Sequence, residues 1–125
     1  MEETIPQIIV VALLLTISAI AKSIQDKLQY HFDKSVFKNL GSFWNPKDSW
    51  KNKYKNNDPK QGAKFLGSTT IFVSLTDSWH LFGLIRDLSI VLCIPIITLN
   101  PYYLLIYPIY RGIFHIMFTY LLNKK

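Results

Sequence analysis

Three long apolar blocks constrain this chain more than any other feature of its sequence. They cover residues 5–21, 67–99 and 102–122 of a chain that is 50% apolar. Crossing the hydrocarbon core of a bilayer takes about 20 predominantly apolar residues of α-helix. Because lipid offers no hydrogen-bond partner to the backbone, such blocks must satisfy their own polar groups as helices. The sequence therefore predicts an all-α integral membrane protein with three transmembrane helices.

The same blocks, with the turn signals between them, predict helix bounds within a single membrane domain, residues 1–125. Helix one is expected at about residues 4–39, because polar residues recur every three or four positions after the first apolar block. Helix two is expected at about 69–99 and helix three at about 102–122. Helices one and two both exceed one straight crossing, so we expect both to extend beyond the membrane.

A cleaved signal peptide is the alternative interpretation of the first block. The residues Ala19-Ile20-Ala21 have the small-x-small form of a cleavage site. Glu2 and Glu3 oppose this interpretation, since the start of a signal peptide carries Lys or Arg. We therefore expect the first block to be a retained helix.

Positive charge gathers between the first two blocks. Ten lysines and four aspartates lie from Lys22 to Lys64, which gives this stretch a net formal charge of +6. Basic residues flank membrane helices mainly on the cytoplasmic side. With three spans, the loop at 40–67 and the lysines at 124–125 fall on one side. The sequence thus predicts a multi-pass protein of the bacterial inner (cytoplasmic) membrane, with its N-terminus outside and the loop and C-terminus in the cytoplasm.

Aromatic residues alternate with lysines in the loop at 40–67, which favours contact with lipid headgroups. Trp and Tyr prefer the headgroup level, and lysines attract anionic lipid. The same alternation could stack on single-stranded nucleic acid, but no nucleic-acid-binding module accompanies it, so that partner ranks well below membrane lipids. The predicted interface residues are Trp44, Lys47, Trp50, Lys51, Lys53, Tyr54 and Lys55.

Ionisable side chains within the second and third blocks are candidates for function, because charges in hydrocarbon are costly and usually have a partner. Asp87 lies thirteen residues before Asn100 and Arg111 eleven after it, so the two share a depth and are predicted to pair. Arg86 would then need a second subunit, a water-lined cavity or His115. The predicted intramembrane polar face comprises Arg86 and Asp87 with Tyr107, Arg111 and His115, the last three spaced by four on one helix face.

A second polar cluster is predicted at the cytoplasmic boundary. Asp and His are common ligands of divalent metals, and a bound metal could activate water against a lipid phosphate. No H-E-x-x-H, G-x-S-x-G or phosphate-binding glycine loop supports this chemistry, so we expect no cofactor and favour a protein without enzymatic activity. The candidate catalytic residues are Asp77, His80 and His31, and the candidate metal ligands are His31, Asp33, Asp77 and His80, with Asp26 at a similar depth.

Two motifs resemble those of a known group of proteins. They are N-P-K-D-S-W-K-N-K-Y-K (Asn45–Lys55) and G-S-T-T-I-F-V-S-L-T-D-S-W-H-L-F (Gly67–Phe82). Both are similar to motifs of uncharacterised short membrane proteins of Bacteroidetes-type bacteria. The resemblance covers about the middle third of the chain. It implies an inner-membrane location and no activity, because such proteins have no assigned function.

Three functional hypotheses follow. The first is a homo-oligomeric membrane component, a channel or pore included, or a subunit of a membrane complex, which uses the polar face of helices two and three. In such an assembly each subunit would supply one polar face, as the subunits of closed homo-oligomers commonly do. The second is a metal-dependent membrane enzyme that acts on lipid headgroups at the cytoplasmic interface. The third is a membrane protein that binds anionic lipid or a partner through the basic loop.

Overall fold

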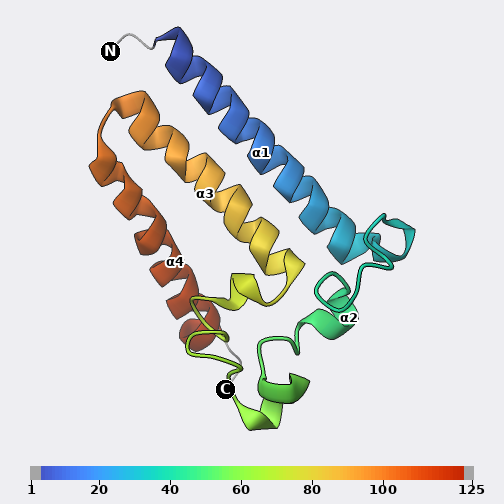
Figure 1. The fold of residues 1–125 in the computed structure, drawn as a ribbon. Helices are drawn as coiled ribbons and strands as arrows, with labels where there is room; N and C mark the ends of the chain where they lie inside the picture. The colour runs from blue at the N-terminus through green and yellow to red at the C-terminus, as the bar shows by residue number, and fades with distance from the viewer. Residues whose placement is uncertain (1–3, 123–125) are drawn as a thin grey trace. The chain divides into compact units, whose positions relative to one another are not determined.

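The computed structural model describes residues 4–122, which are helical without a β-strand (Figure 1). Residues 1–3 and 123–125 lie outside the described part, and with them the terminal glutamates and lysines used to predict topology. Three segments are long and apolar enough to cross a membrane, which confirms the predicted all-α fold with three spans: Ile5–Tyr30, Ser78–Thr98 and Pro101–Leu121.

The helical elements alternate with short turns along the chain. The α-helices are α1 (Ile5–Tyr30), α2 (Pro46–Ser49), α3 (Ser78–Thr98) and α4 (Ile106–Ile116). Between and after them come five 3₁₀ turns and a π-turn: η1 (Phe32–Lys34), η2 (Lys55–Asn57), η3 (Pro59–Gln61), η4 (Val73–Leu75), η5 (Pro101–Leu105) and the π-turn η6 (Met117–Leu121).

The chain divides into two compact units. Unit 1 comprises residues 1–15 and 87–125, and unit 2 comprises residues 16–86. Within unit 1, the Gln7 amide Nε2 of α1 donates to the carbonyl of Ile96 at 3.0 Å. Because the last carbonyls of a helix lack partners within that helix, this bond satisfies one of them at the C-terminal end of α3.

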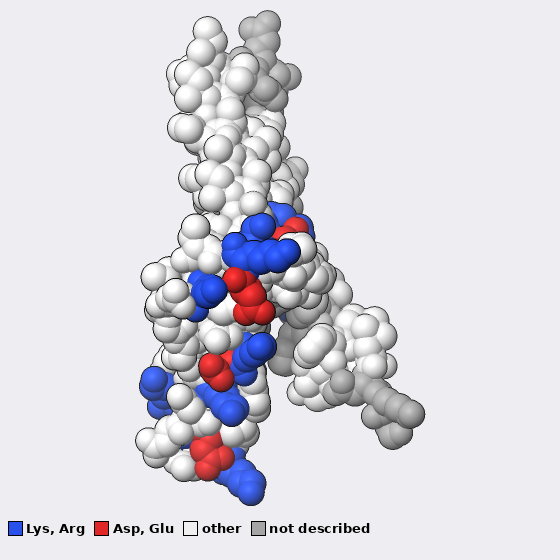
Figure 2. Space-filling view, turned by 90° about the vertical axis from the view of Figure 1, so that its right-hand side faces the viewer, with Lys and Arg blue, Asp and Glu red and all other residues white. Residues whose placement is uncertain are grey.

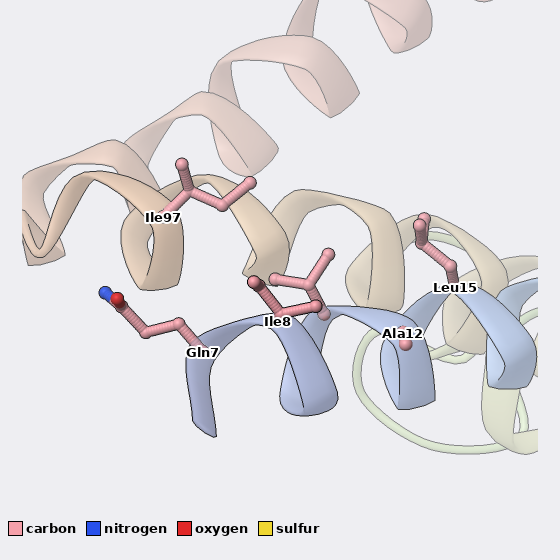
Figure 3. Close-up of a pocket in the computed structure, with 6 residues that line it drawn as sticks. Gln7, Ile8, Ala12, Leu15 and Ile97 are labelled. Carbon is pink, nitrogen blue, oxygen red and sulfur yellow. The ribbon is translucent and has the colours of Figure 1, made fainter. Parts of the chain in front are cut away.

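An open apolar hollow of about 250 Å³ lies beside this contact in unit 1. Figure 3 shows Ile97 of α3 and Ile8 of α1 beside it, with Gln7 at one end. The Gln7 side chain is the polar group of the lining, and it is already bonded to Ile96 and to the backbone of Thr4. The hollow therefore offers hydrocarbon contact and no polar chemistry. Its full lining is Gln7, Ile8, Val11, Ala12, Leu15 and Ile97.

The first helix is shorter than the sequence predicts, since α1 ends at Tyr30 and not near residue 39. After it, the Ser35 hydroxyl donates to the Phe32 carbonyl at 2.7 Å and accepts from the Phe37 amide at 3.2 Å. A serine side chain bonded to nearby backbone groups competes with the helical hydrogen-bond pattern. The chain therefore leaves α1 through the short turn η1.

The second helix also begins later than predicted, at Ser78 and not near residue 69. Gly67 has a φ of +83°, and its carbonyl accepts from the amides of Thr70 and Phe72 at 3.1 and 2.8 Å. A left-handed glycine with local turn bonds interrupts a helix because this backbone conformation does not propagate one. The prediction was wrong here because the apolar character of residues 69–76 belongs to turns and not to a span.

The third span lies close to its predicted bounds but is not a uniform α-helix. Asn100 accepts from the Tyr102 amide at 3.0 Å, and Pro101 follows it, so the segment opens as the 3₁₀ turn η5. The amide of Leu122 donates to the Met117 carbonyl at 2.8 Å, which closes η6. The span is therefore assembled from η5, α4 and η6.

Residues 31–77 of unit 2 form a folded segment between α1 and α3, which we term the loop module. Trp44 stacks on Phe37 with ring centroids 4.8 Å apart, and its ring lies 5.8 Å from that of Phe82 on α3. The Asn52 side chain donates to the Thr76 carbonyl at 3.1 Å. These contacts tie the module to the start of α3, so the predicted loop has a defined tertiary structure.

Candidate functional site

A polar seam joins α1 to the start of α3 in unit 2. The buried face of α1 carries residues spaced by three and four, and two of them are polar. Gly83 of α3 lies opposite: a Cβ added there would be 2.7 Å from the Gln25 Nε2 atom. Absence of a side chain at Gly83 thus gives the glutamine room. The buried residues of this α1 face are Ser18, Ala21, Gln25 and Leu28.

Gln25 is the centre of the seam and is 3% exposed. Its Nε2 donates to the Trp79 carbonyl at 3.0 Å, and its Oε1 accepts from an Arg86 guanidinium nitrogen at 2.7 Å. The Ser18 hydroxyl donates to the Arg86 carbonyl at 3.1 Å. A hydrogen bond from a charged donor is about twice as strong as one between neutral groups. The seam therefore places a cationic side chain against α1 within a single chain.

Arg86 thus has a partner that the sequence interpretation did not name. We predicted a second subunit, a water-lined cavity or His115, and the guanidinium instead contacts Gln25. The recurrence of polar residues along α1 at Ser18 and Gln25 was the available signal. This recurrence predicts that helix one continues beyond the membrane, but the sequence does not show which face of α1 meets α3.

Asp77 and His80 form a close pair at the start of α3. Asp77 is 3% exposed, and its Oδ1 accepts from the His80 amide at 2.9 Å while its Oδ2 lies 2.8 Å from His80 Nδ1. An aspartate that accepts from the backbone amide three residues on is an N-cap. This geometry explains the burial of the carboxylate, and it assigns Asp77 a structural role at the beginning of the helix.

The other residues of the predicted cytoplasmic cluster do not gather around this pair. Asp26 pairs with Lys22 at 2.7 Å on α1, His31 precedes η1, and Asp33 lies within it. Between residues 4 and 122, no three His, Cys, Asp or Glu side chains are grouped closely enough to hold a metal ion. The premature end of α1 accounts for this, because His31 and Asp33 leave the helix that was expected to align them.

On the predicted polar face of α4, Arg111 and His115 are exposed within the chain and Tyr107 is half-buried. No residue in the most apolar part of the span Pro101–Leu121 is buried within the chain. Arg111 lies over the Phe114 ring at 5.5 Å, and His115 Nδ1 is 3.4 Å from the Thr119 hydroxyl. Among the described residues, Arg111 forms no ion pair with Asp87. The guanidinium lies along its own helix, over Phe114, and the pairing with Asp87 stays a prediction.

The predicted interface residues lie on the loop module. Lys51 is 5.4 Å from the centre of the Trp50 ring, and Lys53 is 5.5 Å from that of Tyr54. Trp44 differs from the others, since it belongs to the aromatic cluster with Phe37. Figure 2 shows basic and acidic side chains intermingled on one face of the molecule. The remaining predicted residues of this surface are Lys47 and Lys55.

No family model, curated protein or solved structure matches this chain. Its functional interpretation therefore depends on the contacts of its own residues. Two features carry it. The span Pro101–Leu121 has no buried residue in its most apolar part and yet bears Arg111, and the loop module combines lysines with exposed apolar side chains.

Proposed function

We propose that this protein is a homo-oligomeric component of the bacterial inner membrane, with α4 at the contact between copies. The observation that carries the proposal is the exposure of Arg111. Within residues 4–122 its guanidinium has an aromatic ring as its neighbour and no hydrogen-bond or ion-pair partner. A charged side chain near the middle of a span costs about 2.5–3.5 kcal/mol on insertion scales. An arginine side chain that faces protein or water in place of lipid avoids that cost.

A second copy of the chain fits this face. Tyr107 and His115 lie one helical turn on either side of Arg111, and each offers an acceptor atom to a neighbouring guanidinium. In a symmetric contact the same face meets itself, so each arginine reaches the tyrosine or histidine of the other copy. Interhelical hydrogen bonds of this kind hold membrane helices together where the hydrophobic effect gives no net attraction.

Arg111→Leu is therefore expected to weaken the oligomer. The substitution removes the donor and leaves an apolar helix that is stable in lipid as a monomer. We expect the wild-type chain in mild detergent to run as a defined oligomer by native mass spectrometry, and the variant to shift at least tenfold toward monomer at equal concentration, which corresponds to about 1.4 kcal/mol.

The matched control is Ile113→Ala, because residue 113 lies about 200° around the helix from residue 111 at nearly the same depth. It should leave the oligomer unchanged. A wild-type chain that is monomeric, with no partner co-purifying, contradicts the proposal. So does an equal shift in both variants, since that would show a general loss of packing.

The proposed topology places the N-terminus outside and the loop module in the cytoplasm. Capping at Asp77 leaves α3 with 21 residues, which is about 30 Å of helix and one crossing of the hydrocarbon core. The lysines of the loop module then lie at the cytoplasmic end, as the distribution of charge favours.

Cysteine labelling tests this orientation. In a Cys93→Ala background, Gln61→Cys of the loop module should resist an impermeant maleimide in cells with a permeabilised outer membrane, and should react once the inner membrane is opened. Tyr103→Cys, in η5 at the outer end of the third span, should react in both. The reverse pattern would invert the topology.

A further inference from the structure

An exposed apolar segment immediately precedes α3. Leu66 is 94% exposed and Ile71 is 78% exposed, although neither belongs to a transmembrane helix. Large apolar side chains gathered on a surface commonly mark an interaction site. We term this segment the apolar tip, and its exposed members are Phe65, Leu66, Ile71, Phe72 and Leu75.

The apolar tip has a fixed conformation. The Gly67 carbonyl accepts from the Phe72 amide at 2.8 Å, and the position of a Cβ at Gly67 lies 2.7 Å from the Phe72 ring. Ser68, which is fully buried, donates its hydroxyl to the Lys53 carbonyl at 2.7 Å. The tip is therefore a tight turn with a buried anchor, and its apolar side chains are displayed by the fold.

Lysines lie at the base of the tip. The Lys64 amide donates to the Lys53 carbonyl at 2.9 Å, next to the isolated bridge between Tyr54 and Ala63. The same Lys53 carbonyl accepts from Ser68, so the tip and both lysine backbones meet at one point. Six lysines and two aspartates lie between residues 43 and 66, which makes this surface cationic.

The geometry points to insertion of the apolar tip into the anionic lipid leaflet that surrounds α3. Apolar side chains next to lysines are the pattern of segments that lie in the membrane interface, where the former enter the acyl boundary and the latter meet phosphate. Leu75 precedes the first residue of α3, Ser78, by three positions, so the tip begins at the level of the headgroups. Charge complementarity favours anionic lipid over a neutral one.

A fluorophore on Leu66→Cys, in the full-length Cys93→Ala chain, tests this insertion. Reconstituted in nanodiscs of phosphatidylcholine with phosphatidylglycerol, the label should emit at shorter wavelength and be quenched at least threefold more by nitroxide lipids than the same label on Gln61→Cys. In phosphatidylcholine alone, or with Lys53→Gln and Lys64→Gln, the quenching should fall toward that of the control.

Each other outcome overturns the proposal. Equal quenching at residues 66 and 61 would show that the tip stays in water. Equal quenching in neutral and anionic discs would remove the role of the lysines. Protection of residue 66 from both lipid and aqueous quenchers would show that a protein, such as a second copy, covers the tip. The test does not depend on the oligomeric state.

Discussion

Gln25→Leu is expected to lower the free energy of unfolding of the full chain in mixed micelles by about 3 kcal/mol. The substitution removes two hydrogen bonds, one of them from the charged Arg86, and places an apolar side chain against the Trp79 carbonyl and the Arg86 guanidinium. A lost bond to a charged group costs about 1.5–3 kcal/mol and a neutral one about 1 kcal/mol. Unfolding followed by helicity against the mole fraction of denaturing detergent measures the difference.

Two further variants show whether the loss of stability comes from the hydrogen bonds of Gln25. Gln25→Glu keeps the acceptor toward Arg86 and loses the donor toward Trp79, so its loss should be smaller than that of the leucine variant. Gln29→Leu is the matched control, because it makes the same chemical change on an exposed residue of α1 that accepts a bond of 3.3 Å from Trp79 Nε1. Equal losses for Gln25→Leu and Gln29→Leu would contradict a central role for Gln25.

Asp77→Ala is expected to lower the free energy of unfolding by about 2 kcal/mol. The side chain caps α3 by accepting from the His80 amide, and loss of such a cap costs about 0.5–2 kcal/mol. Burial of Asp77 places this variant at the upper end, since the freed amide is screened from water. Faster hydrogen exchange in the first turn of α3 should accompany the loss of stability.

The structural role of Asp77 is distinguished from metal binding by two further variants. Asp77→Asn keeps an oxygen that can accept from the His80 amide. Its decrease in the free energy of unfolding should therefore be less than half of that of Asp77→Ala. His80→Ala should have a small effect, because the imidazole is partly exposed. Equal destabilisation by the alanine and asparagine variants would contradict the cap. Stabilisation of the wild type by a divalent metal, lost in His80→Ala, would restore the metal hypothesis.

The loop module shows where local patterns mislead. Residues 69–76 are apolar, so periodicity extends the second helix through them, yet Gly67 and Asp77 place turns there. Likewise, the Ser35 side chain bonds to the backbone of Phe32 and Phe37 in a stretch where the spacing of polar residues predicts a continued helix. In both cases a side-chain or backbone hydrogen bond of about 1 kcal/mol decides between two local conformations of similar stability. Hydropathy and periodicity averaged over several residues do not predict a single hydrogen bond of this kind.

The amino-acid sequence by itself determined the class of this protein, because three apolar blocks of this length have few stable arrangements other than helices in lipid. It also located the charges that need partners. Only the tertiary structure decided those partners: Arg86 meets Gln25 across Gly83, Asp77 caps its own helix, and Arg111 stays exposed on α4. Periodicity fixes the face on which a residue lies, whereas the neighbour of that face depends on how helices distant in sequence pack.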